Sequence, residues 1–164
     1  MKMIKEKLPL LAVLIALSVV LGMMINVPIP GSNGYFNLLD VGIYTTALLF
    51  GGPAGLVVGA VSGLLLDLLL GYPQWMIFSF VIHGLQGYIA GQWTQQKSWS
   101  TKVAILIIAS FVMVSSYFLA TGLLYGFGAA IVSLVGNVFQ VSAGVAGAYL
   151  MTTALAKTKH QVGN

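Results

Sequence analysis

The chain has 164 residues, of which 59% are hydrophobic and only 6% are charged. A soluble domain carries roughly a quarter charged residues, so this composition indicates an integral membrane protein. Seven lysines, no arginine and three acidic residues leave a net charge of +4, which is too small to follow a phosphate backbone and argues against nucleic-acid binding. Cysteine is absent and the two histidines, His83 and His160, are far apart, so no metal site or cofactor is predicted.

Apolar runs separated by glycine, proline and polar residues predict an all-α integral membrane protein with six transmembrane helices, since a spanning helix needs about 20 mostly apolar residues. The expected spans, in chain order, are residues 8–27, 38–50, 53–70, 75–93, 103–124 and 129–156. The second span is short, and the sixth is longer than one crossing requires, so we expect the sixth to tilt or to begin outside the hydrocarbon. Residues 1–164 thus form a single predicted membrane domain.

The positions of the lysines support an even number of crossings, because cytoplasmic loops are enriched in basic residues. Lys2, Lys5 and Lys7 precede the first span, Lys97 and Lys102 flank the loop between the fourth and fifth, and Lys157 and Lys159 follow the sixth. Six crossings place all of these lysines on one side of the membrane. That side is then the cytoplasm, and both termini are predicted to lie there.

Three of the predicted helices carry a narrow stripe of polar and aromatic side chains, given a turn of about 100° per residue. The stripes are Trp75, Ser79, His83 and Gln86 on the fourth span, Ser110, Met113, Tyr117 and Thr121 on the fifth, and Ser133, Asn137, Gln140 and Gly144 on the sixth. Single serines and threonines are typical of helix packing. The large amide and imidazole groups of His83, Gln86, Asn137 and Gln140 instead favour a ligand site open to the outer side.

Two carboxylates, Asp40 and Asp67, are expected near the outer membrane interface. Water reaches a carboxylate near a helix end, so simple structural tolerance is one interpretation. The other interpretation is that Asp40 or Asp67 orders the outer loops or pairs with a polar or cationic ligand.

Small residues repeat at one-turn spacing on two spans. Ala12 and Ala16 do so on the first, and Gly55, Gly59 and Gly63 on the third. Such spacing lets helices approach closely, either inside the bundle or against another subunit. For the glycines we expect packing inside the bundle.

Catalytic motifs are missing from the sequence. It contains no GxxxxGK[ST] loop, no HExxH motif, no serine nucleophile motif and no paired catalytic carboxylates. We therefore predict no enzymatic activity and no catalytic residue, and any ATP-driven work would have to come from partner proteins.

Residues 12–16, 35–44, 49–55, 67–73 and 81–91 together resemble a known family, the substrate-binding S components of energy-coupling factor (ECF) vitamin transporters. The chain is most similar to the branch that takes hydroxymethylpyrimidine, pyridoxine-type vitamers and riboflavin. The resemblance implies a six-helix bundle in the plasma membrane of a prokaryote, which captures a vitamin from outside. It also implies a lid formed by residues 26–37, with Asn33, Tyr35 and Asn37 in it.

The same resemblance implies partners. The face that carries Ala12 and Ala16 would dock on a transmembrane coupling subunit (EcfT-type), and two cytoplasmic ATPase subunits would supply the energy. The S component would then topple in the bilayer to deliver its substrate inward.

The chemistry of the candidate site suggests the kind of ligand. Trp75, Tyr72 and Tyr117 offer stacking faces, and the amide and imidazole groups offer directional hydrogen bonds, so a small aromatic heterocycle fits. No lysine or arginine is expected on the outer side, which disfavours phosphorylated ligands. Among the vitamins that the resemblance implies, hydroxymethylpyrimidine or a pyridoxine-type vitamer is predicted, with riboflavin as an alternative.

Two functions of other classes remain open. The first is a small ion-coupled carrier or channel with Asp40, Asp67 and His83 as a proton path. The second is a membrane subunit without transport activity, in which the polar stripes only hold helices together.

Overall fold

The structure is a computed structural model that describes residues 8–162, with side chains described as far as Lys157. Lys2, Lys5 and Lys7, and the side chains of Lys159 and His160, lie outside the described residues. In chain order the elements are α2 (Leu8–Met24), β1 (Asn26–Ile29), β2 (Gly34–Asn37), α3 (Leu39–Phe50), α4 (Gly52–Leu70), the 3₁₀ turn η1 (Pro73–Trp75), α5 (Met76–Gln92), α6 (Trp99–Tyr125) and α7 (Phe127–Val162). The predicted helical class is confirmed.

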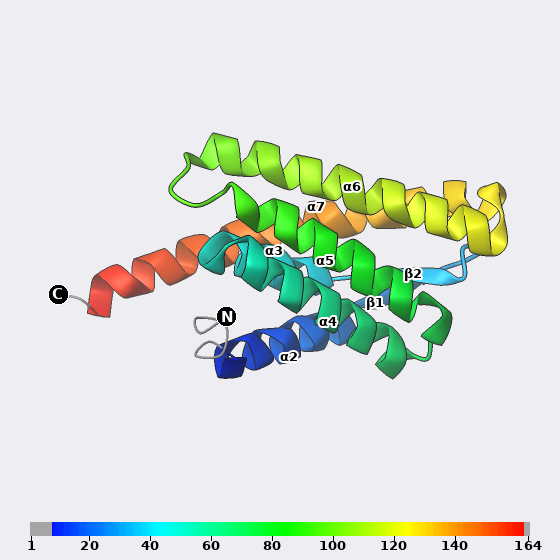
Figure 1. Ribbon diagram of the computed structural model, residues 1–164, viewed down its shortest axis with the longest axis horizontal. Coiled ribbons are helices and arrows are strands. Elements are labelled where there is room, and N and C mark those ends of the chain that lie inside the picture. The colour runs from blue at the N-terminus through cyan, green and yellow to red at the C-terminus, as the bar shows by residue number, and fades with distance from the viewer. Residues whose placement is uncertain (1–7, 163–164) are drawn as a thin grey trace.

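A β-hairpin follows the first helix. The first span was expected to reach Val27, but α2 ends at Met24, and β1 and β2 pair antiparallel with Val27 opposite Phe36. Two prolines, Pro28 and Pro30, cannot continue a helix, and Gly31 at a φ of 84° starts the reversal of the chain. The extended part of the predicted lid is therefore a short sheet at one end of the bundle (Figure 1).

Helices α4 and α5 are the most closely packed pair in the bundle and lie side by side (Figure 1). A Cβ atom at Gly55 would meet the backbone carbonyl of Gly87, and one at Gly59 would meet that of His83. These glycines therefore let two backbones touch, which confirms the expected packing role inside the bundle. This close contact between α4 and α5 determines the position of Ser79 and His83, the polar residues of the predicted stripe that lie nearest to it.

The last two helices are longer than the predicted spans. Helix α6 begins at Trp99, four residues before the expected start at residue 103, because the Ser98 side chain accepts a hydrogen bond from the backbone N–H of Thr101 and caps it. Gly126, at a φ of 87°, makes the sharp turn into α7, which runs on to Val162. In Figure 1 the carboxyl-terminal part of α7 extends past the other helices.

Within residues 8–162, three helices are long and apolar enough to cross a membrane, namely α4, α6 and the part of α7 from Phe127 to Lys157. The apolar helices α2 and α3 are shorter. The start of α2, the connection between α5 and α6, and the end of α7 all lie at the end of the bundle opposite the hairpin (Figure 1). This arrangement agrees with the grouping of lysines on one side, and the number of six crossings stays a prediction.

Candidate functional site

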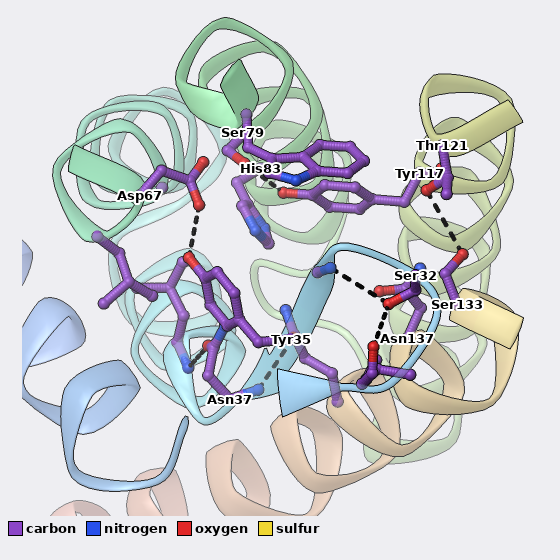
Figure 2. A pocket seen from close by; sticks show the side chains of 17 residues that line it. Ser32, Tyr35, Asn37, Asp67, Ser79, His83, Tyr117, Thr121, Ser133 and Asn137 are labelled. Carbon is purple, nitrogen blue, oxygen red and sulfur yellow. Dashed lines mark hydrogen bonds between the residues drawn. The ribbon is translucent and has the colours of Figure 1, made fainter. Parts of the chain in front are cut away.

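A small cavity lies between the hairpin and helices α3 to α7. Nine of the predicted binding and lid residues line it: Tyr35, Asn37, Asp67, Trp75, Ser79, His83, Tyr117, Asn137 and Gln140. Figure 2 shows side chains from the hairpin, α4, α5, α6 and α7 pointing toward this space. Residues distant in sequence thus share one hollow.

The remaining predicted residues lie elsewhere. Gln86 and Asp40 are fully buried behind His83 and do not line the cavity. Tyr72 and Asn33 line a second, shallower hollow on the outer face of the hairpin. Ala12 and Ala16 lie on the exposed side of α2, away from the side chains that this helix packs against the bundle.

Aromatic rings form one wall of the cavity. The indole of Trp75 is 4% exposed, and its ring centroid lies 5.9 Å from that of Tyr117. The Tyr117 hydroxyl shares a 2.6 Å hydrogen bond with Ser79, and its ring lies 5.5 Å from the His83 ring. Because each ring is held by a neighbour, the wall offers a preformed stacking surface to a flat ligand.

The hairpin closes over this wall through specific bonds. Tyr35 donates a hydrogen bond of 2.5 Å to Asp67 on α4, and Trp75 Nε1 donates one of 3.0 Å to the backbone carbonyl of Asn33. Burial raises the pKa of Tyr35, and the nearby Asp67 carboxylate raises it further, so the phenol keeps the proton that it donates. The hairpin is therefore held to the helices through the last residue of its turn, Asn33, and through Tyr35 on β2.

Loss of the phenol should loosen this closure. A hydrogen bond to a charged group contributes about 1.5 to 3 kcal/mol, so Tyr35→Phe should speed amide hydrogen exchange in residues 34–37 by roughly ten-fold or more. Tyr149→Phe makes the same change at a half-exposed ring that packs on Trp99, and it serves as the control. Equal exchange rates in both variants and the wild type would show that Asp67 does not hold the hairpin.

A buried polar network lies beneath the cavity. His83 Nδ1 is 2.7 Å from Gln86 Oε1, Gln86 Nε2 donates to Tyr44 Oη at 2.9 Å, and that hydroxyl is 2.7 Å from Ser110 Oγ. Tyr44 was missed as a site residue, although it follows Asp40 by one helical turn and so lies on the same face of α3. This network explains why Gln86 faces away from the cavity.

Several lining residues were also missed as site residues: Ser32, Thr121 and Ser133. Thr121 and Ser133 belong to predicted polar stripes, so their spacing already indicated an inward direction. Ser32 is fully buried, and its hydroxyl donates to the carbonyl of Ile29 inside the hairpin turn. A loop serine gives no periodic signal, and its position follows only from the hairpin.

The polar groups left free in the cavity define what it can bind. Asn137 is 7% exposed, and its side-chain amide makes no hydrogen bond with the other side chains or the backbone of the described residues. Among the described residues, no lysine or arginine side chain lines the cavity, while Asp67 does. The site can therefore stack a flat ring and exchange directional hydrogen bonds, but it offers no charge-assisted bond to a phosphate.

The fold and the cavity define a small helical membrane protein with a pocket between its helices and a hairpin. The family model of the ECF-type riboflavin transporter, S component, matches residues 2–157. The thiamine precursor transporter HmpT of Lactococcus lactis subsp. cremoris (strain MG1363) is 43% identical over 154 residues, which cover 93% of this chain and 89% of that protein. The chain belongs to the family of ECF transporter S components, which are membrane proteins of vitamin uptake and not enzymes.

Two further comparisons agree with this family. An uncharacterized protein of Pyrococcus woesei is 33% identical over 124 residues, covering 75% of this chain and 83% of that protein. A solved S component of a bacterial ECF transporter has a TM-score of 0.69 at 23% identity and covers 98% of this chain and 99% of that structure. At that identity the solved structure supports the fold alone.

Proposed function

We propose that the protein captures a small, unphosphorylated aromatic heterocycle from the outer side of the membrane, and that hydroxymethylpyrimidine, a thiamine precursor, is its ligand. The observation that carries the proposal is the cavity, which combines the Trp75 and Tyr117 rings with the free amide of Asn137. A substituted pyrimidine has a flat face to stack and ring nitrogens, an amino group and a hydroxyl to bond. The thiamine precursor transporter among the relatives supports this ligand.

Riboflavin is the second candidate, and the description of the matching family model favours it. Its three fused rings and polyol chain occupy much more space than a pyrimidine. Its binding would require the hairpin to move, because Tyr35 and Asn37 already border the cavity. A pyridoxine-type vitamer is intermediate, since it has one ring with several hydroxyl groups.

A titration of the purified protein with each compound decides among these ligands. Trp75 lines the cavity, so a stacked ligand should quench tryptophan fluorescence. Hydroxymethylpyrimidine is expected to bind at least ten-fold more tightly than pyridoxine or riboflavin. Tighter binding of riboflavin would replace the proposed ligand, and the failure of every heterocycle to bind would favour a purely structural role for the polar stripes.

Single truncations in the cavity test the assignment of the site. His83→Ala, Asn137→Ala and Gln140→Ala should each weaken ligand binding by roughly ten-fold, since a hydrogen bond contributes about 1 to 1.5 kcal/mol. Ser142→Ala is the control, because Ser142 lies on the exposed face of α7 and bonds only to the carbonyl of Val138. Unchanged affinity in all three cavity variants would remove this pocket from the proposal.

We further propose that import depends on a transmembrane coupling subunit (EcfT-type) and two ATPases, in the plasma membrane of a prokaryote. The exposed position of Ala12 and Ala16 on α2 leaves a smooth face for docking. Uptake in cells that express all the subunits should fail when ATP is depleted. Uptake that instead survives ATP depletion and collapses with the proton gradient would favour an ion-coupled carrier that uses Asp40, Asp67 and His83.

A further inference from the structure

A chain of hydrogen bonds connects the hairpin to the floor of the cavity. It begins at the backbone N–H of Asn37, which donates to Gln140 Oε1 at 3.1 Å. A backbone N–H can only donate, so this bond establishes which end of the Gln140 amide is the oxygen. The Gln140 NH₂ group therefore points the other way, toward Asp40 Oδ1 at 3.4 Å.

The same Asp40 oxygen determines the direction of the next bond. Because Gln140 donates to Asp40 Oδ1, this oxygen acts as an acceptor, and it keeps that role even if Oδ2 carries a proton. His83 Nδ1 lies 3.4 Å from Asp40 Oδ1. A lone pair on Nδ1 would face another lone pair there, so Nδ1 carries the proton.

The hydrogen bonds of Gln86 are also consistent with a proton on His83 Nδ1. Its Oε1 lies 2.7 Å from His83 Nδ1, and its Nε2 donates to Tyr44 Oη at 2.9 Å. Reversal of the Gln86 amide would place a donor against a protonated Nδ1. Tyr44 then accepts from Gln86 and shares a 2.7 Å hydrogen bond with Ser110 Oγ in which either hydroxyl can donate, so no bond along the chain sets two donors or two acceptors against each other.

The other ring nitrogen of His83, Nε2, is left for the cavity. His83 lines the cavity, and Nε2 makes no hydrogen bond with any residue that the structure describes. The Nε2 atom is also not among the described polar atoms that are both sealed from solvent and unpaired. In Figure 2 the ring points from α5 into the space between Tyr35 and Tyr117.

We propose that His83 is held as the neutral Nδ1–H tautomer and presents the Nε2 lone pair to the cavity, so that it accepts a hydrogen bond from an O–H or N–H group of the ligand. The existence of a ligand rests on the proposed function, whereas the tautomer is argued from the structure alone. Asp40 and Gln86 are positioning residues, because neither lines the cavity and both act on the ligand only through His83. The ligand class is narrowed to heterocycles with a donor group at their edge.

The first experiment reads the tautomer directly in the full chain. His160→Gln leaves His83 as the sole histidine, and the protein is labelled with ¹⁵N-histidine in lipid nanodiscs. We expect a pyrrole-type ¹⁵N shift for Nδ1 and a pyridine-type shift for Nε2 without any ligand present. A pyrrole-type Nε2 signal, or two protonated nitrogens, would overturn the proposal.

Variants of Asp40 and Gln86 test whether these residues set the tautomer of His83 or only help the protein to fold. Asp40→Asn keeps a carbonyl oxygen that can accept from Nδ1, so the tautomer should be retained. Asp40→Leu combined with Gln86→Leu removes both acceptors, and a pyridine-type Nδ1 signal should then appear. An unchanged spectrum in a folded double variant would show that these residues do not set the tautomer.

The second experiment tests whether His83 accepts a hydrogen bond from the ligand. It uses two derivatives of hydroxymethylpyrimidine, one methylated only on the hydroxyl group and the other dimethylated only on the amino group, so that each lacks one donor. At least one of the two methylated compounds should bind the wild type ten-fold or more weakly than the parent pyrimidine does. In His83→Ala that compound and the parent should bind with equal affinity. Equal losses in both proteins would overturn the acceptor role. If the parent pyrimidine does not bind at all, the proposed function fails, while the ligand-free spectrum still reports the tautomer.

Discussion

Gly59→Val is expected to separate helices α4 and α5 and to cause the largest loss of stability of any single change considered. A Cβ atom at Gly59 would contact the backbone carbonyl of His83, and a backbone cannot rotate aside as a side chain can. Overpacking of this kind costs about 3 kcal/mol. For a chain of this size the cost corresponds to a fall in Tm of roughly 10 °C, which thermal unfolding in detergent measures.

Ligand binding should be lost together with stability in this variant. The carbonyl that Gly59 contacts belongs to His83, and the neighbouring Gly63 lies against the carbonyl of Ser79, so the helix crossing positions two cavity residues. Gly128→Ala is the matched control, because nothing lies within 4 Å of a Cβ built there. A Tm for Gly59→Val that matches the control would mean that the bundle tolerates separation at this crossing.

Trp75→Ala is expected to give the largest loss of ligand affinity, roughly 100-fold or about 2.7 kcal/mol. Stacking of a flat base on an aromatic side chain contributes about 1 to 3 kcal/mol when measured by alanine substitution. The indole also supports the Tyr117 ring and donates to the carbonyl of Asn33, so its removal opens the hairpin as well. Calorimetric titration with hydroxymethylpyrimidine measures the affinity.

Two further variants separate the contributions of Trp75. Trp75→Phe keeps an aromatic face but loses the bond to Asn33, so we expect about a ten-fold loss, mainly through faster dissociation. Trp93→Ala removes an exposed tryptophan at the other end of α5 and should leave the affinity unchanged. Similar losses for Trp75→Ala and Trp93→Ala would mean that the effect is not local to the cavity.

The interior of the site shows where prediction from sequence reaches its limit. Helical spacing placed Trp75, Ser79 and His83 on one face of the fourth predicted span, and the structure keeps all three on the cavity side. The same spacing included Gln86, which instead bonds to His83 and Tyr44 behind the cavity. A periodic pattern gives the face of a helix, but it does not tell which neighbouring helix each residue on that face meets.

The sequence by itself determined that the chain is a helical membrane protein and that the last three helices carry inward polar faces, because composition and periodicity report the solvent that each side chain meets. The tertiary structure alone decided that residues 26–37 form a hairpin, that Tyr35 bonds to Asp67, and that Asp40 lies beside His83. These pairs join residues far apart in the chain. Their contact depends on how whole helices pack, and local periodicity carries no information about that packing.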